Sequence, residues 1–170
     1  MVRKQNGFVV VDEVTAGLGR MGGWFGFQHY NIQPDMVVLG KILGNGYPVS
    51  AVAMTSRVAD QLLASRFHYA QSHQNDPLGC AVAREVITTL KQEGLPERSR
   101  NLGRWFLGEL NALSRRFTAV REVRGRGLMI VLELESGANE PTRAVYQELL
   151  RAGIIVGCKP AANILRFYPP

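Results

Sequence analysis

Cysteine is scarce in this chain, with Cys80 and Cys158 the only two among 170 residues. They lie far apart and follow no metal-binding or redox spacing, and none of the three histidines has a partner at the spacing of a metal site. These absences argue against a disulfide-stabilised secreted module and against a metal centre. We expect two free thiols in a reducing, cytoplasmic compartment.

Long apolar runs are also missing, and no signal peptide is visible in residues 1–5. No stretch is long enough to cross a bilayer, so we expect no membrane association. The 20 basic residues exceed the 14 acidic ones and give a net charge of +6. The arginines are scattered and do not alternate with aromatic residues, so the charge predicts a solvated face and no nucleic-acid partner.

Hydrophobic residues make up 46% of the chain, which is enough to bury a core. Two short β-branched segments each end in charged residues: Phe8–Glu13 ends in Asp12 and Glu13, and Val37–Lys41 ends in Lys41. This is the pattern of buried parallel strands that present functional side chains at their carboxyl ends. We expect Asp12 and Lys41 to lie beside one site; the alternative is a structural salt bridge between them or two unrelated strand-end charges.

The rest of the chain alternates loops, strands and helices. A glycine-rich loop is predicted over residues 14–23, and an aromatic cluster on a short helix over residues 24–30. Further strands are predicted over residues 49–54, 120–123, 128–134, 154–156 and 164–167. Helices are predicted over residues 57–64 with Ser56 as N-cap, from Pro77 to Gly94, over 102–113 and over 142–151. The change to a small α+β pattern after residue 117 predicts a domain boundary near Gly94–Pro96, with the following helix as a connector.

Two nucleotide-binding motifs match only in part. Gly17–Gly22 fits GxGxxG, but it does not turn directly from a strand into a helix, so dinucleotide binding is disfavoured. Phe8–Glu13 also fits the acid-ended Walker-B strand of a P-loop ATPase. Gly40-Lys41 is followed by Ile42, so the matching phosphate loop is missing from this chain. A fragment of such an ATPase remains an alternative.

The order and spacing of several motifs closely resemble the class III aminotransferases of the omega and acetylornithine/ornithine type. These motifs are Val11–Val14, Gly17–Gly22, Trp24-Phe25, Pro34–Val37, Gly40-Lys41, Gly46–Ala51, Asp76–Ala81, Val123–Met129 and Leu165–Pro170. The resemblance implies an α/β protein of fold type I that depends on pyridoxal 5′-phosphate (PLP). It implies part of a mixed, mainly parallel large-domain sheet with helices on both faces, plus a small C-terminal α+β domain. Residues 1–95 would be the C-terminal part of the large PLP-binding domain, and residues 96–170 the connector helix and an incomplete small domain.

The resemblance also implies a site. Lys41 would form the Schiff base with the cofactor aldehyde and act as the acid–base group, while Asp12 would pair with the pyridine nitrogen. Thr15 stands where relatives often have a glutamine that contacts the cofactor's phenolic oxygen. Ser72 would bind the cofactor phosphate of the neighbouring subunit in a homodimer. Arg166 would hold a substrate carboxylate in a bidentate fork.

The reaction implied is transfer of an amino group from an amino acid or amine donor to a 2-oxo acid acceptor. Glu13 is expected either to support the site or to order a loop, and Arg124 and Arg126 are expected to order a turn between two strands. The chain enters a strand within its first ten residues and ends directly after another. We therefore expect a C-terminal fragment with little activity of its own, and a non-catalytic fragment is the alternative.

Overall fold

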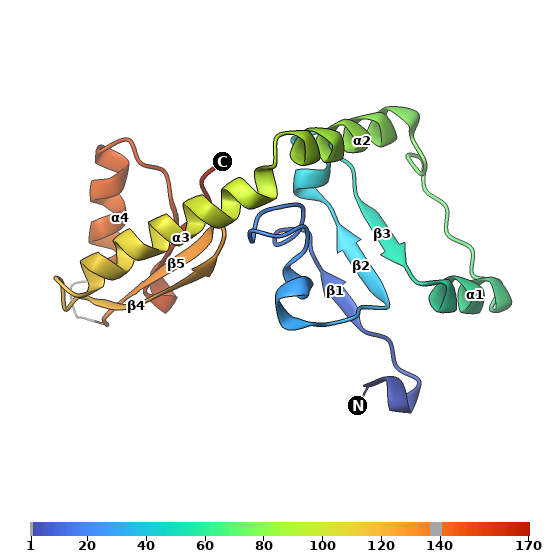
Figure 1. Ribbon diagram of the computed structural model, residues 1–170, viewed down its shortest axis with the longest axis horizontal. Coiled ribbons are helices and arrows are strands. Elements are labelled where there is room, and N and C mark those ends of the chain that lie inside the picture. The colour runs from blue at the N-terminus through green and yellow to red at the C-terminus, as the bar shows by residue number, and fades with distance from the viewer. Residues whose placement is uncertain (1, 137–140) are drawn as a thin grey trace. The chain divides into compact units, whose positions relative to one another are not determined.

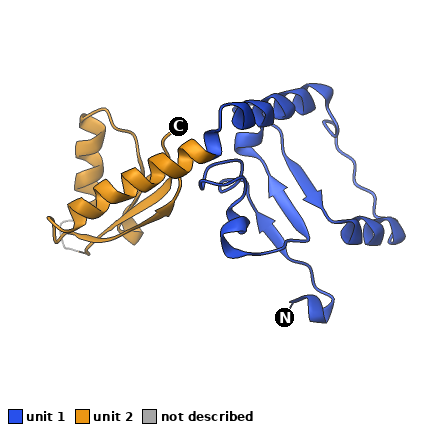
Figure 2. Ribbon diagram, in the orientation of Figure 1, with its two compact units in different colours: residues 1–96 blue, residues 97–170 orange. Residues whose placement is uncertain are grey.

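The structure is a computed structural model that describes residues 2–136 and 141–170 (Figure 1). The chain divides into two compact units, Met1–Pro96 and Glu97–Pro170 (Figure 2). Helix α3 (Leu95–Ser114) begins at the boundary between them. None of the described helices is long and apolar enough to cross a membrane. The assignment of the two units to a large and a small domain stays a prediction.

Unit 1 is built on a three-stranded sheet in the order β1 (Val10–Asp12), β2 (Met36–Leu39) and β3 (Ala51–Met54). Strands β1 and β2 run parallel, with Asp12 opposite Val38, and β3 is antiparallel to β2. The parallel pairing of the first two strands is confirmed. Because parallel strands end at the same edge of a sheet, Asp12 and the segment that begins at Lys41 reach one edge.

The expected burial of these strands is wrong for this chain. Val10 is 53% exposed, and all four residues of β2 are only half-buried. A β-branched composition reports which residues favour burial, whereas burial itself needs a covering layer of helices. The described residues do not supply that layer over these side chains.

The described part of unit 1 also contains five helical segments. They are the 3₁₀ helices η1 (Val2–Gln5), η2 (Gly26–Tyr30) and η3 (Lys41–Leu43), and the α-helices α1 (Ser56–Ala64) and α2 (Pro77–Gln92). Ser56 was predicted to be the N-cap of α1, but this prediction is wrong: Ser56 is the first residue of the helix, and Thr55 holds the extended capping position. Asp76 caps α2 by accepting a hydrogen bond from the Leu78 amide at 3.3 Å. The glycine-rich loop leads into turns and not into an α-helix, which agrees with the rejection of dinucleotide binding.

Unit 2 is an antiparallel sheet with helices packed on one face. The strands are β4 (Val120–Arg126), β5 (Met129–Leu134), β6 (Gly157–Lys159) and β7 (Ile164–Phe167), in the order β4-β5-β7-β6. A short 3₁₀ helix, η4 (Pro160–Ala162), links β6 to β7. Alternate residues of β5 are buried, which gives the sheet one apolar face. Helices α3 and α4 (Pro141–Arg151) cover that face around the core residues Leu110, Ile130, Leu132, Leu134 and Leu165.

Two predictions in unit 2 are corrected. The apolar triplet Ile154–Val156 is not a strand; Ile155 is 87% exposed, and the strand β6 begins at Gly157. The register of β6 is fixed by its pairing with β7, in which Gly157 lies opposite Arg166. An apolar triplet alone does not determine it. Arg124 and Arg126 do not form the turn between β4 and β5, because both lie within β4 and pair across to β5. The turn is Gly127-Leu128, and Gly127 supplies its left-handed φ of 52°.

Candidate functional site

The carboxyl ends of β1 and β2 form the centre of the candidate site. The Glu13 amide donates to the Val38 carbonyl at 2.9 Å, which keeps the two strands paired to their last residues. Asp12 is the last residue of β1, opposite Val38, and its Oδ1 accepts a hydrogen bond from the Val14 amide at 3.0 Å. The Asp12 carboxylate is thus exposed at the edge and oriented by its own loop.

Lys41 lies directly after β2 with a φ of 42°, a left-handed conformation that is uncommon for a residue other than glycine. Residues held in such conformations cluster at functional sites. Its exposed side chain reaches back to the loop after β1, and Nζ donates a hydrogen bond to Thr15 Oγ1 at 2.5 Å. Thr15 is thereby placed beside the lysine amine, a contact that the motif comparison did not predict.

Asp12 and Lys41 form no ion pair with each other within residues 2–136 and 141–170. The structural salt bridge considered as the alternative is therefore absent from this arrangement. The partner of the amine is a neutral hydroxyl, and the carboxylate accepts only from backbone. Both charged groups remain open to a third molecule at the same edge of the sheet.

Glu13 orders the loop. Its side chain is only 4% exposed, and its two carboxylate oxygens accept from the amides of Gly26 at 2.9 Å and Phe27 at 2.8 Å. These amides open the helix η2, where backbone donors lack intrahelical partners. Of the two roles expected for Glu13, the structure shows loop ordering, and this loop also carries Thr15.

Replacing Glu13 with glutamine is expected to lower the free energy of unfolding by about 1–3 kcal/mol, because one buried amide would face an NH₂ group that cannot accept. Urea denaturation of both proteins measures the change. Glu85→Gln, on the exposed face of α2, is the matched control and should leave stability nearly unchanged. Equal stability of the Glu13→Gln variant and the wild type would show that the two hydrogen bonds contribute nothing.

Two further carboxylates connect parts of unit 1; one of them, Asp35, lies at the amino end of β2, away from Lys41. Asp35 is buried and accepts from the Val9 amide at 2.8 Å; this hydrogen bond, assisted by Arg3, holds the pKa of Asp35 below its usual value. The Tyr47 hydroxyl donates to Asp76 Oδ2 at 3.1 Å, and this bond raises the pKa of Tyr47. Because Asp76 also caps α2, the bond ties the segment after Lys41 to the start of that helix. The Asp76-Pro77 dipeptide indicated the start of the helix in the sequence, but nothing in the sequence indicated that Tyr47 is the partner of Asp76.

Ser72 and Arg166 do not belong to the sheet of unit 1. Ser72 lies in the exposed stretch between α1 and α2, and its hydroxyl forms no hydrogen bond with another described residue. Arg166 belongs to β7 in unit 2, where its side chain is exposed. The structure therefore brings together Asp12, Thr15 and Lys41, and the roles expected of Ser72 and Arg166 stay predictions.

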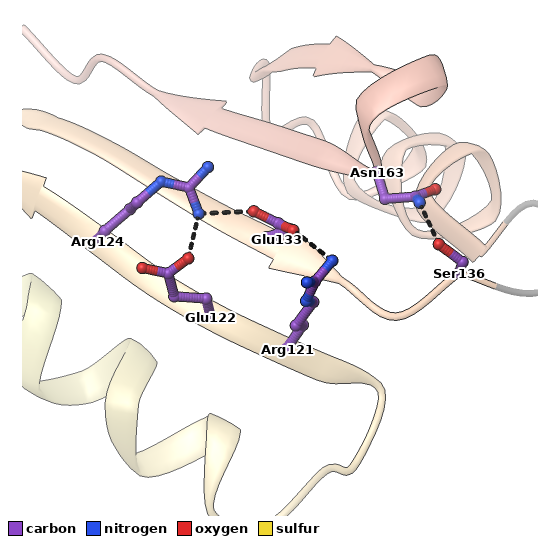
Figure 3. A network of polar contacts seen from close by, with 6 residues as sticks. All are labelled: Arg121, Glu122, Arg124, Glu133, Ser136 and Asn163. Atoms are coloured by element: carbon purple, nitrogen blue, oxygen red, sulfur yellow. Dashed lines mark hydrogen bonds and ion pairs between the residues drawn. The ribbon is translucent and has the colours of Figure 1, made fainter.

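Arg124 has a structural role in the sheet of unit 2 (Figure 3). Its guanidinium contacts both Glu122 and Glu133 at 2.7 Å, and Glu133 also pairs with Arg121 at 3.0 Å. The hydrogen bond to Glu133 is the main cause that raises the pKa of Arg124. These contacts join β4 to β5, so Arg124 links strands and is not available for an anion.

Comparison with known proteins gives consistent matches. A model of the family described as aminotransferase class-III matches residues 1–170. The acetylornithine aminotransferase of Methanothermobacter thermautotrophicus is 33% identical over 170 residues, which are 100% of this chain and 42% of that protein. The chain therefore spans less than half the length of the curated relatives that it matches.

Solved structures agree. The ornithine aminotransferase of Toxoplasma gondii, described with partial occupancy of PLP at its active site, has a TM-score of 0.88 and 33% identity over 99% of this chain and 39% of its own. A phospholyase from Arthrobacter in complex with phosphoethanolamine has a TM-score of 0.91 and 29% identity, covering 99% of this chain and 42% of its own. The expected fold-type I architecture is confirmed by these likenesses. Because the family model matches every residue, this chain belongs to the class III aminotransferases, which are PLP-dependent enzymes.

Proposed function

We propose that the protein containing this chain transfers an amino group from an amino acid or amine to a 2-oxo acid, with PLP bound covalently at Lys41. The observation that carries the proposal is the exposed Lys41 amine, held by Thr15 at 2.5 Å beside the carboxylate-bearing end of a parallel strand. The activity is assigned to the whole protein, because the chain covers only 42% of a curated relative.

The residues at the sheet edge fit this cofactor. PLP, when bound, supplies an aldehyde that a primary amine can capture and a ring that accepts the electron pair of a carbanion. Lys41 offers a primary amine with no carboxylate paired to it in the described part of the chain. Asp12 offers an exposed carboxylate at the end of the neighbouring strand. A primary amine and an unpaired carboxylate at one edge are the donor set that the cofactor needs.

Each residue has a distinct task in the proposed site. With the cofactor bound, Lys41 would hold it covalently, and its free Nζ would carry the proton that the reaction moves. Asp12 would accept a hydrogen bond from the protonated ring nitrogen and stabilise its charge. Thr15 orients the free amine, since its hydroxyl accepts from Nζ. A threonine that binds the lysine in this way takes a different role from the glutamine of relatives.

The remaining assignments complete the proposal. Ser72 binds the cofactor phosphate of the neighbouring subunit, so the protein acts as a homodimer; its exposed hydroxyl without a partner in the described chain supports this role. Arg166 holds a substrate carboxylate, which its exposure on β7 supports. The free thiols of Cys80 and Cys158 support a cytoplasmic location.

The proposal is tested on the protein as its gene encodes it, incubated with PLP, 2-oxoglutarate and a panel of amino donors that includes ornithine. Formation of glutamate, identified by mass spectrometry, is the expected result. Product identification matters because the Arthrobacter phospholyase has the same fold. Release of phosphate from phosphoethanolamine without glutamate formation would replace the transaminase assignment with a lyase. A protein that binds PLP and releases neither product would favour the non-catalytic alternative; the ATPase alternative is excluded, because the chain belongs to the class III aminotransferases.

Replacing Asp12 with asparagine is expected to lower kcat by about 10²–10³-fold, because an amide cannot stabilise the charge on the ring nitrogen. The hydrogen bond from the Val14 amide can persist, since asparagine also offers an Oδ1 acceptor. Covalent retention of the cofactor at Lys41, measured by borohydride reduction and peptide mapping, should therefore continue. Asp60→Asn on the exposed face of α1 is the control. An unchanged kcat in the Asp12→Asn variant would exclude Asp12 from the site.

A further inference from the structure

Four residues form one row across the sheet of unit 2. Arg124 pairs with Val131, Val131 with Arg166, and Arg166 with Gly157. Residues paired across an antiparallel sheet project to the same face. The neighbouring row contains the buried pair of Leu132 and Leu165, so the row of arginines lies on the face away from the core.

The two arginines in this row differ in their partners. Arg124 is engaged by two carboxylates at 2.7 Å (Figure 3). Arg166 has no carboxylate within ion-pairing distance among the described residues, and its guanidinium lies 5.9 Å from the centre of the Tyr168 ring. Tyr168 is the first residue after β7, and the contact with its ring places it beside the guanidinium. A ring at this distance attracts the guanidinium but accepts none of its N–H groups in the way a carboxylate does, so a carboxylate can still accept two of them.

Gly157 supplies the space beside this side chain. A Cβ at residue 157 would lie 3.2 Å from Arg166 Nε, 3.3 Å from its Cβ and 3.5 Å from Nη2. Glycine weakens a strand, and its presence inside one marks close approach of another group. Here the group that approaches is the side chain of the opposite residue, so glycine at this point of β6 lets the arginine lie against the strand.

We propose that Gly157 and Tyr168 position the Arg166 guanidinium for carboxylate binding, so that the residue at 157 sets the affinity of the enzyme for substrates that carry a carboxylate. This inference rests on the proposed function, in which Arg166 anchors the substrate. Gly157 provides the space and Tyr168 the flat surface, and neither contacts the carboxylate itself. Both are positioning residues, and a larger side chain at 157 displaces the guanidinium in proportion to its size.

The first experiment needs no catalysis. Phenylglyoxal modification of Arg166 in the whole protein is followed by peptide mass spectrometry, with and without propionate as a carboxylate probe. Propionate is expected to slow modification of Arg166 in the wild type and in Gly157→Ala, less in the latter, and to give no protection in Gly157→Val. Arg121, which pairs with Glu133, is the internal control and should be modified equally in all three. Equal protection of Arg166 in the wild type and in Gly157→Val overturns the proposal.

The second experiment separates this proposal from the proposed function. With pyruvate as acceptor, Gly157→Val is expected to raise KM by about tenfold, the size of one lost charge-assisted contact. With acetaldehyde, which lacks only the carboxylate of pyruvate, KM should not change, and kcat should change little with either. Tyr168→Phe keeps the ring and should match the wild type, whereas Tyr168→Leu should follow Gly157→Val.

The outcomes are distinguishable. A KM for pyruvate that rises in Arg166→Gln but not in Gly157→Val overturns the positioning roles and leaves the proposed function standing. Absence of transamination in the wild type overturns the proposed function. Protection of Arg166 by propionate then tests, without catalysis, whether Arg166 binds a carboxylate. Thermal unfolding of Gly157→Ala and Gly157→Val verifies that the sheet is intact, and Gly108→Ala, where a Cβ meets nothing within 4 Å, is the matched glycine control.

Discussion

Replacing Lys41 with alanine is expected to abolish covalent retention of PLP and to lower transamination by about 10²–10⁴-fold, the range that a positioned acid–base group contributes. Among Asp12, Thr15 and Lys41 at this sheet edge, only Lys41 carries an exposed amine. No neighbouring side chain can replace it, because a hydroxyl and a carboxylate do not capture an aldehyde in the same way. The measurement is borohydride reduction followed by peptide mapping, together with the glutamate assay.

The variant should remain folded. The Lys41 side chain is exposed, and its hydrogen bond to the Thr15 hydroxyl is the contact that the variant loses, so stability should change by less than about 0.5 kcal/mol. Lys91→Ala, at the exposed end of α2, is the matched control and should retain both the cofactor adduct and the activity. An adduct that maps to another lysine in the wild type would remove Lys41 from its assigned role.

Replacing Gly103 with alanine is expected to destabilise unit 2 by about 1–3 kcal/mol or more, because helix α3 lies directly against the β4–β5 turn. A Cβ at Gly103 would lie 2.1 Å from the Gly127 carbonyl oxygen and 2.7 Å from its Cα. These are backbone atoms, so no side-chain rotation relieves the overlap, and either the helix or the turn must move. Chemical denaturation measures the loss in the free energy of unfolding.

The same helix contains its own control. Gly108 is exposed, and a Cβ there meets nothing within 4 Å. Gly108→Ala should therefore increase stability by up to about 1 kcal/mol through helix propensity alone. Opposite signs for two identical substitutions five residues apart would establish that the contact with Gly127, and not the loss of glycine, causes the effect. A Gly103→Ala variant as stable as the wild type would contradict the close packing of α3 on the turn.

The sequence predicted the carboxyl ends of β1 and β2 well because local chemistry determines them. Asp12 and Lys41 come at the ends of β-branched runs, and a charged group is favourable there because it reaches the edge of the sheet. The starts of α1 and α2 also depend on local residues and were predicted, except that the capping position of α1 is one residue earlier than predicted. The predicted strand over residues 154–156 failed because an apolar triplet fits more than one register, and only pairing with β7 selects Gly157–Lys159.

Contacts between distant residues could not be read from the sequence. The hydrogen bond from Lys41 to Thr15 joins residues 26 apart, and the loop-ordering contacts of Glu13 reach Gly26 and Phe27. Each depends on how the loop after β1 folds back, which side-chain types alone do not specify. The same holds for Tyr47 and Asp76, whose partnership ties the segment after Lys41 to helix α2.

The sequence by itself determined the family motifs, the parallel pair of strand ends and the identity of the groups that chemistry would use, because these follow from residue type and local spacing. Tertiary structure alone decided which partner each group has. It gave Lys41 a hydroxyl and not the Asp12 carboxylate, and among the described residues it left Arg166 without a carboxylate while Arg124 received two. It also placed Gly157 beside Arg166. Strand register fixes every cross-strand neighbour, and register results from pairing across the whole sheet.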